Sequence, residues 1–318
     1  MSRKLASIDL GTHTARLLIA EWDEASQRIV PVTRYRTYVH LGDAFQNTSG
    51  GGFLSMDAAV RVVDTLHEFD RRLHEYGVET TIAVVTGVIR QARNRDDFLR
   101  VLREETGIDA KVVSGEEEAR LTATAVHHAA DRGNKPHLVV DLGGGSTEFV
   151  LVQNDQWWVK SIAIGASVLT ENYLKRDPPG KQAVSSLRKF ITRSLMNGLD
   201  RIPFSRVFSM VGTGGTIVTL GALLHGIPMK KLDPDCVNGL QITRESIQAL
   251  FEEMITLERE ERVNRYGLDV CRAHVFPAGV LLATEIMNLF SMDQLTVCFS
   301  DLLEGLIWEQ VEDNEYAQ

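Results

Sequence analysis

The chain has 318 residues, 44% of them hydrophobic and 24% charged, which is typical of a globular protein with two domains of ordinary size rather than of a disordered or fibrous one. Its formal net charge of −9 argues against a broadly basic surface for nucleic acid. We find no signal-like N-terminus and no apolar run of the roughly 20 residues that span a membrane, so we expect a cytoplasmic protein with neither a nucleic-acid nor a membrane partner.

The first part of the chain predicts a run of strands followed by alternating helices and strands. Apolar alternation and β-branched residues predict strands at about 5–10, 15–22 and 29–41. Leu66, Phe69 and Leu73 recur at helical spacing, which predicts a long amphipathic helix. A strand, a helix, a strand and a helix then follow in TIAVVTG, DDFLRVLREE, AKVVS and EEEARLTATAVHHAA. The predicted order is βββαβαβα.

The second part of the chain repeats this plan. Strands are predicted in HLVVDLGG, TEFVLVQ, VKSIAIG and RVFSMVG, with helices near 166–174, 181–197 and from Thr216. The segment IDLGTHTARLLIAE (8–21) corresponds to VDLGGGSTEFVLV (140–152). We therefore predict domains at 1–125 and 126–318, with a C-terminal helix at about 302–318 that packs back on the first domain.

Both corresponding segments are apolar strands that end in an acid and turn through small and hydroxyl residues. Such a turn exposes backbone N–H groups in a concave nest that suits phosphate oxygens, and glycine lets the backbone approach the ligand. A tight hairpin turn is the structural alternative. The residues that we predict to bind phosphate in the two turns are Gly11, Thr12, His13 and Thr14, and Gly143, Gly144, Gly145, Ser146 and Thr147.

Three acids lie at these turns. Asp9 and Asp141 end the two strands, and Glu148 follows the second turn. Hard carboxylate oxygens of this kind hold Mg²⁺ loosely, with waters and substrate phosphates completing its shell. We predict a magnesium site formed by these acids, while acids that merely cap turns are the alternative.

Further anion-binding groups are predicted outside the two turns. A third glycine cluster, GTGG, closes a strand and opens a helix whose N-terminus suits an anion; its residues are Gly212, Thr213, Gly214 and Gly215. Arg90 and Arg93 follow the strand TIAVVTG and face the same ligand if that turn is irregular, whereas a solvated helix start is the alternative.

A predicted helix at 181–195 is rich in cations in a chain that is acidic overall. These cations are Lys181, Arg188, Lys189 and Arg193. They are placed to guide a long polyanion, and a plain charged helix face is the alternative.

The motifs together resemble a known family. Two strand–Asp–Gly turns, the GTGGT turn and the duplicated halves resemble the actin/Hsp70/hexokinase superfamily, with two ribonuclease-H-like domains and an interdomain cleft. Within it, the chain is similar to the exopolyphosphatase/guanosine pentaphosphate phosphohydrolase family. The segments that carry this likeness are DLGTHTARLLI (9–19), TGVIRQARN (86–94), SGEEEARL (114–121), DLGGGSTEF (141–149), SIAIGA (161–166) and GTGGT (212–216).

The resemblance implies an α/β fold and a hydrolase activity that removes the terminal phosphate of polyphosphate, of guanosine pentaphosphate, or of both, with Mg²⁺. It supports Arg90 in particular as a phosphate ligand and implies Glu118 as the general base, in a protein of the stringent response. From the residues alone, Ser114 and Glu117 form a capping box, which leaves Glu118 for another role. The resemblance leaves a homodimer open as the oligomeric state.

Two departures from the family pattern bear on these expectations. The first turn has Gly11-Thr-His-Thr14 where the family commonly has GSNS, and Asp301-Leu-Leu-Glu-Gly305 lacks the arginine of a common GLREG. The second departure keeps a sensor without catalysis as an alternative function. A kinase of the same superfamily is another alternative, because it would share the glycine turns and transfer phosphate to an acceptor instead of water.

Overall fold

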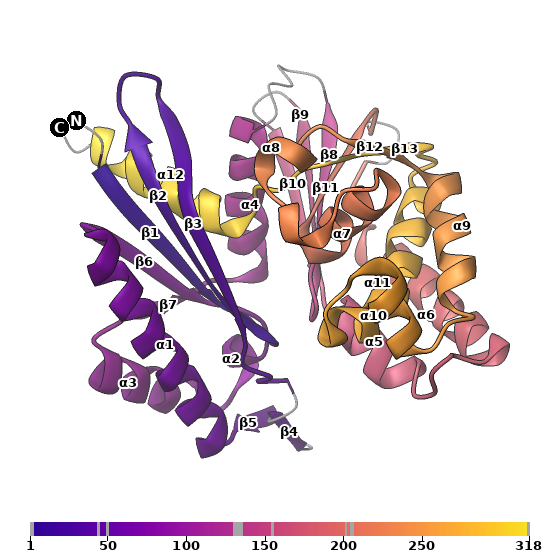
Figure 1. The fold of residues 1–318 in the computed structure, drawn as a ribbon, viewed down its shortest axis with the longest axis horizontal. Helices are drawn as coiled ribbons and strands as arrows, with labels where there is room; N and C mark the ends of the chain where they lie inside the picture. The colour runs from indigo at the N-terminus through magenta and orange to yellow at the C-terminus, as the bar shows by residue number, and fades with distance from the viewer. Residues whose placement is uncertain are drawn as a thin grey trace. The chain divides into compact units, whose positions relative to one another are not determined.

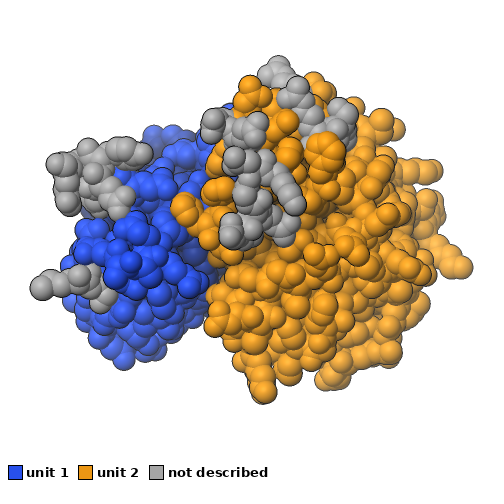
Figure 2. Space-filling model, turned by 90° about the horizontal axis from the view of Figure 1, so that it is seen from above, with its two compact units in different colours: residues 1–125, 302–318 blue, residues 126–301 orange. Residues whose placement is uncertain are grey.

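The computed structural model describes residues 3–42, 45–48, 51–129, 136–153, 156–200, 202–203 and 207–316. The chain forms two compact units (Figure 2): unit 1 joins residues 1–125 to 302–318, and unit 2 comprises 126–301. The division falls within helix α4 (Gly115–Ala129). Each unit has its own sheet and its own hydrophobic core.

Unit 1 is built on a five-stranded sheet with the order β3-β2-β1-β6-β7 (Figure 1). The strands are β1 Arg3–Leu10, β2 Thr14–Asp23, β3 Arg28–Tyr38, β6 Thr80–Val85 and β7 Ala110–Val112, with a separate hairpin of β4 Phe45–Thr48 and β5 Gly51–Leu54. β1, β2 and β3 form an antiparallel meander, whereas β6 and β7 run parallel to β1. The carboxyl ends of β1, β6 and β7 therefore meet at one edge of the sheet.

Helices cover both faces of this sheet (Figure 1). Adjacent residues of a strand point to opposite faces, and Leu17 and Leu18 show this directly. Leu17 packs in the core with Phe69 of α1 (Met56–Tyr76), which α3 (Arg95–Thr106) also joins. Leu18 packs on the opposite face with Ile307 of α12 (Leu302–Tyr316). Because both faces are buried, β2 contains four successive apolar residues, LLIA, at positions 17–20.

Helix α12 is fixed to unit 1 by polar as well as apolar contacts. The hydroxyl of Ser7 donates to the carbonyl oxygen of Leu303 at 2.7 Å, and Glu304 forms an ion pair with Arg34 of β3. Leu303, at the position where the family pattern has arginine, is 2% exposed and packs beside Trp22. The departure at this position therefore places an apolar residue in an apolar site.

Unit 2 repeats the plan of unit 1 on a six-stranded sheet with the order β10-β9-β8-β11-β13-β12 (Figure 1). The strands are β8 His137–Leu142, β9 Thr147–Gln153, β10 Gln156–Ile162, β11 Met210–Thr213, β12 Gln241–Thr243 and β13 Gln294–Val297. Apart from the edge strand β12, the order and directions match those of unit 1. This duplicated order is the ribonuclease-H-like arrangement, and the predicted fold class is confirmed.

The helices of unit 2 surround α11, which lies in its core. They are α5 Ala166–Tyr173, α6 Lys181–Gly198, α7 Gly214–Leu224, α8 Pro234–Val237, α9 Arg244–Met254, α10 Arg259–Tyr266 and α11 Val270–Leu289, with a 3-10 helix at Met229–Lys231. From the sequence we expected no segment long and apolar enough to cross a membrane. By length and composition α11 is such a segment, but 72% of its apolar window is buried within the structure. It has the burial of a core helix.

Candidate active site

The two predicted turns have the same local structure. In unit 1 the N–H of Gly11 donates to the carbonyl oxygen of Thr14 at 2.9 Å, and in unit 2 the N–H of Gly143 donates to that of Ser146 at 3.1 Å. Each turn joins two antiparallel strands at the carboxyl end of the first strand of its sheet. The internal repeat seen in the sequence is thus also a repeat of backbone geometry.

The turn of unit 2 has backbone donors to offer an anion. One of its carbonyl groups is fixed by helix α5, since the N–H of Ser167 at the start of α5 donates to the carbonyl oxygen of Gly144 at 3.0 Å. Among the residues that the structure describes, none accepts a hydrogen bond from the N–H of Gly144, Gly145 or Ser146. These neighbouring N–H groups form the kind of concave nest that binds phosphate.

Three of the predicted hydroxyl ligands have structural partners instead. The hydroxyl of Thr147 donates to the carbonyl oxygen of Ile164 at 2.7 Å, and that of Thr213 donates to Ser300 at 3.0 Å. The hydroxyl oxygen of Thr12 accepts the N–H of Val88 at 3.2 Å, in α2 (Gly87–Gln91). In unit 2, Ser146 is the predicted hydroxyl residue whose side chain has no hydrogen-bond partner within the described part of the chain.

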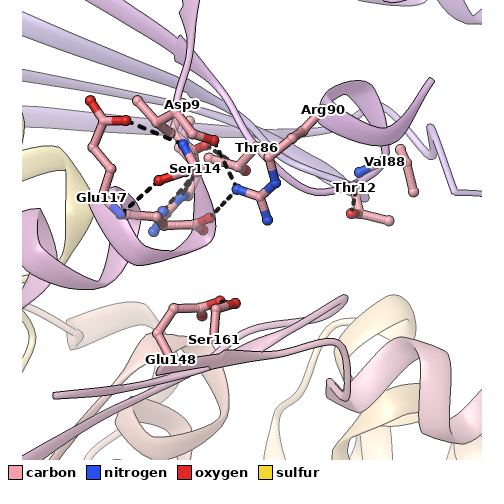
Figure 3. Close-up of polar contacts among 12 residues, drawn as sticks. Asp9, Thr12, Thr86, Val88, Arg90, Ser114, Glu117, Glu148 and Ser161 are labelled. Carbon is pink, nitrogen blue, oxygen red and sulfur yellow. Dashed lines mark hydrogen bonds and ion pairs between the residues drawn. The ribbon is translucent and has the colours of Figure 1, made fainter. Parts of the chain in front are cut away.

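Asp141 and Glu148 lie directly opposite each other in the β8–β9 ladder. Directly opposed side chains point to the same face of a sheet, with Cβ atoms about 5 Å apart. Glu148 is 3% exposed, and Ser161 of β10 donates its hydroxyl to Oε1 of Glu148 at 2.7 Å (Figure 3). The pair of carboxylates brings hard oxygen atoms and two negative charges to one point of unit 2.

This pair fits part of a magnesium shell. In the described part of the chain, no group of three or more His, Cys, Asp and Glu side chains is arranged to hold a metal ion. Mg²⁺ commonly takes only one or two carboxylates from the protein and keeps water or substrate phosphate in its other positions. Asp141 and Glu148 therefore suit Mg²⁺ better than a metal that needs a complete protein cage.

Asp9, the equivalent of Asp141 in unit 1, has different partners. Nε and Nη2 of Arg16 donate to its Oδ2 at 3.0 and 2.8 Å, and the hydroxyl of Thr86 donates to its Oδ1 at 3.1 Å. The carboxylate is buried, with 4% exposure. A metal ion would have to share this carboxylate with a guanidinium group.

Glu118 lies in the first turn of α4, whose start is set by its sequence. The N–H of Glu117 donates to the hydroxyl of Ser114 at 3.1 Å, and the N–H of Ser114 donates to Glu117 at 3.2 Å (Figure 3). The predicted capping box is therefore confirmed. The next residue is left out of the cap, and Oε2 of Glu118 accepts a hydrogen bond from Nη1 of Arg90 at 3.0 Å.

The environment of Glu118 suits a general base. Its side chain is 13% exposed, and burial, followed by the negative charge of Asp9, raises its pKa from 4.5 to about 7, with Arg90 and Arg16 opposing the shift. A carboxylate with a pKa near neutrality accepts protons far more readily than an ordinary glutamate. The same nitrogen of Arg90 also donates to the carbonyl oxygen of Val113 at 3.0 Å, which fixes the guanidinium beside α4.

Comparisons with known proteins identify the family of the chain. Residues 18–314 match the model of the Ppx/GppA phosphatase family. The chain belongs to this family. It is 31% identical over 314 residues to exopolyphosphatase 2 of Mycobacterium tuberculosis, covering 95% of this chain and 97% of that protein. It is also 27% identical over 311 residues to exopolyphosphatase 1 of Mycobacterium leprae, covering 97% and 90%.

Solved structures show the same likeness. The Aquifex aeolicus member of the Ppx/GppA family is 30% identical, with a TM-score of 0.84 over 99% of both chains. An exopolyphosphatase from Cytophaga hutchinsonii is 25% identical, with a TM-score of 0.85 over 98% of both chains. The chain is thus a phosphate-removing hydrolase of the Ppx/GppA phosphatase family.

Not every residue predicted for this phosphatase lies beside Glu118 or Asp141. Arg93 is exposed, and its guanidinium carbon lies 5.9 Å from the ring centroid of Phe53 in the β4–β5 hairpin. Gly212 is buried in the sheet, where an added Cβ would lie 3.0 Å from Leu295. The structure gives these residues packing roles, and their predicted phosphate contacts stay predictions.

The remaining first-turn and third-turn predictions have defined places. The carbonyl oxygen of His13 accepts the N–H of Val39 at 2.8 Å, which ties the first turn to the end of β3. Gly214 begins α7 with a φ of +86°, and an added Cβ would lie 2.6 Å from Oδ1 of Asp141. Glycine is therefore needed at this position both for its backbone conformation and for the close approach of the carboxylate.

Sequence reasoning missed several residues of the site. Thr86 binds Asp9, Ser161 binds Glu148, and Arg272 of α11 lies against Gly215 at the start of α7. Thr86 and Ser161 begin the family-like segments TGVIRQARN and SIAIGA, so these motifs are the signal that could have identified them. The short segment CRAHVFPAG gave no spacing signal that distinguishes Arg272 from an ordinary helical cation.

Proposed function

We propose that this phosphatase hydrolyses the terminal phosphoanhydride bond of inorganic polyphosphate, and that Glu118 is its general base. The observation that carries the proposal is the placement of Glu118, buried beside Arg90 and Asp9 with a pKa near neutrality. The relatives named as exopolyphosphatases support the choice of polyphosphate.

In the proposed mechanism, Glu118 accepts a proton from the attacking water. The water oxygen forms a bond to the terminal phosphorus while the bond from phosphorus to the bridging oxygen breaks, and the electron pair of that bond goes to the shortened chain. Such a transition state is loose, so catalysis depends on positioning and on stabilising charge rather than on covalent chemistry. The pKa of about 7 lets Glu118 be ionised and still basic at neutral pH.

The remaining groups hold phosphate oxygens. In the proposal, the N–H groups of Gly144, Gly145 and Ser146 bind an anion in unit 2. Arg90 uses Nη1 for Glu118 and Val113, and its other guanidinium nitrogens donate to no residue that the structure describes. We assign those nitrogens to a phosphate oxygen, so that Arg90 both orients the base and binds the substrate.

Asp141 and Glu148 are the proposed ligands of Mg²⁺. When bound there, the ion would neutralise phosphate charge. Asp9 is the third ligand expected from the sequence, but its bonds to Arg16 and Thr86 suit a positioning role beside Glu118 better. The chain then divides its two equivalent acids between two tasks.

Guanosine pentaphosphate is a second proposed substrate. It ends in the same kind of phosphoanhydride bond. The family model that matches the chain is named for two phosphatases, Ppx and GppA. The two glycine turns offer N–H groups to phosphate oxygens, which a nucleotide and a phosphate chain present alike. Hydrolysis of guanosine pentaphosphate would connect the enzyme with the stringent response.

The test is phosphate release from long-chain polyphosphate and from guanosine pentaphosphate with Mg²⁺, for the wild type, Glu118→Gln and Glu116→Gln. Glu116 lies in the same helical turn but is exposed, so it is a matched control. We expect Glu118→Gln to lower kcat by about 10²–10⁴ with little change in KM, and Glu116→Gln to keep wild-type turnover.

Other outcomes would identify the rival functions. Binding of either substrate without phosphate release would indicate a sensor, and release that requires an added acceptor would indicate a kinase. Equal turnover of Glu118→Gln and wild type would remove Glu118 from the role of base.

A further inference from the structure

Helix α6 of unit 2 has a face made of cations. Its 18 residues, KQAVSSLRKFITRSLMNG, contain no acid. At 100° per residue, all four cations fall within an arc of roughly 140°, which borders the buried side formed by Leu187, Ile191 and Leu195. The residues of this face, called here the α6 basic face, are Lys181, Arg188, Lys189 and Arg193.

Several cations of other surface helices are neutralised by acids of the same helix. In α1, Arg72 pairs with Glu68 at 3.0 Å, and in α3, Arg100 pairs with Asp97 at 3.3 Å. Within the basic face, Arg188 pairs with Glu285 of α11. The other three residues of the face form no ion pair with any part of the chain that the structure describes.

The segment before α6 adds to this positive charge. Lys175 and Arg176 are exposed, and neither has an ion pair among the described residues. The one acid nearby, Asp177, binds the buried guanidinium of Arg262 at 2.7 Å. Lys175 and Arg176 therefore add positive charge next to the basic face, and Asp177 does not neutralise it.

The first cation of the face does not stabilise the helix. Lys181 is the first residue of α6, the first turn has no acid, and Gly180 provides no side-chain cap. A cation at a helix N-terminus opposes the helix dipole and weakens the helix. Helix stability therefore does not explain the position of Lys181.

The end of α6 lies close to the phosphate turn of unit 2. Gly198, its last residue, packs against Ile162 of β10. Ile162 pairs with Thr147 in the sheet, and Thr147 is the first strand residue after the turn. Helix α6 packs on the sheet face opposite to Asp141 and Glu148, with its last residue against β10, the neighbour of the strand that follows the turn. From Arg193 the basic face continues for about 18 Å to Lys181.

We propose that the α6 basic face binds the extended part of a polyphosphate chain, beyond the phosphates at the reaction centre. The proposal rests on the proposed function and names the long form of its substrate. Single-stranded nucleic acid fits less well, because its binding relies on open aromatic rings for base stacking. Phe190, the aromatic residue of α6, lies outside the face and packs on Tyr173 with ring centroids 4.9 Å apart.

The test compares long polyphosphate with a form shorter than the face. The triple variant Lys181→Gln, Lys189→Gln, Arg193→Gln is set against a control, Lys111→Gln, Lys230→Gln, Lys231→Gln, which removes the same charge from exposed sites elsewhere. For the first variant we expect KM for long polyphosphate to rise about tenfold at low salt, with KM for the short form and kcat unchanged. The plot of log affinity against log salt should become less steep, its slope decreasing in magnitude by roughly 2.

Direct binding keeps the test independent of turnover. Labelled long polyphosphate is titrated into the wild type, the triple variant and the control, with single-stranded RNA as competitor. Weaker binding by the triple variant alone supports the proposal even if no protein releases phosphate. Unchanged KM and Kd for long chains would overturn it while leaving the hydrolase intact, and RNA bound in place of polyphosphate would overturn it too.

Discussion

Arg16 lies directly opposite Asp9 in the β1–β2 ladder, and its guanidinium binds the carboxylate at 2.8 Å. At the equivalent place in unit 2, the residue opposite Asp141 is Glu148. The duplicated halves therefore share a backbone but differ in charge. Unit 1 pairs an acid with a guanidinium beside Glu118, whereas unit 2 places two carboxylates opposite each other.

We predict that Glu148 and Asp9 differ in their effect on the Mg²⁺ requirement. Glu148→Gln removes one of two carboxylates that face each other, so the Mg²⁺ concentration for half-maximal activity should rise at least tenfold, on the order seen when metal sites lose a supporting group. Asp9→Asn should leave that concentration nearly unchanged. Titrating phosphate release with Mg²⁺ measures this concentration for both variants. An equal rise in Glu148→Gln and Asp9→Asn would place Asp9 among the Mg²⁺ ligands.

Ser161 is predicted to act through Glu148. Its hydroxyl holds Oε1 of Glu148 at 2.7 Å, and such supporting bonds orient metal ligands. Ser161→Ala should raise the Mg²⁺ requirement about tenfold, with kcat at saturating Mg²⁺ near wild type, and Ser161→Thr should recover part of the loss. A fall in kcat that excess Mg²⁺ does not restore would contradict this role.

The pH dependence of the reaction should follow the ionisation of Glu118. A base must be deprotonated to act, so kcat/KM should rise with pH and reach half of its plateau near the pKa of about 7. Asp9 raises this pKa through its negative charge, so Asp9→Asn should move the midpoint to lower pH. Profiles of the wild type, Asp9→Asn and Glu116→Gln test this. A midpoint that stays in place in Asp9→Asn would show that the two carboxylates are not coupled.

Much of this site could be predicted from the sequence because turns and caps are local. The apolar strand before Asp141, its glycine turn and the Ser114–Glu117 cap are each fixed by residues close in the chain. The duplicated order of strands was predictable from hydrophobic periodicity in the same way. Short pieces such as β12 and the β4–β5 hairpin were missed, since three or four residues carry too little periodicity.

Contacts between distant segments could not be predicted from the sequence. Thr86 meets Asp9 across 77 positions, and Thr213 turns its hydroxyl to Ser300 rather than toward a ligand. The local sequence around a hydroxyl in a glycine-rich turn is the same whether the hydroxyl binds a phosphate or a carbonyl oxygen. Only the packing of the next strand or loop decides which partner it has.

Glu118 should reduce the stability of the folded protein at neutral and alkaline pH. Its pKa is raised on folding, so between 4.5 and about 7 the native state holds more protons than the unfolded state. Stability from this group is therefore present at low pH and is lost as pH rises through 7, by at most about 3 kcal/mol. Glu118→Gln should raise Tm at pH 8 and leave it nearly unchanged at pH 4. Lower stability of the variant at pH 8 would mean that the ionised carboxylate is net stabilising.

Gly214 should be far less replaceable than another glycine with a left-handed backbone. Gly77 at the end of α1 has a φ of +66° with no atom within 4 Å of an added Cβ, so Gly77→Ala should cost only the backbone term of about 1–2 kcal/mol. At Gly214 the φ is +86°, and the added Cβ would lie 2.6 Å from both Oδ1 of Asp141 and the carbonyl oxygen of Leu142. Gly214→Ala should therefore lose more stability and also raise the Mg²⁺ requirement, because the methyl group displaces the Asp141 carboxylate. Urea unfolding and magnesium titration of both variants measure the difference, and equal losses would show that the backbone alone sets the need for glycine at the start of α7.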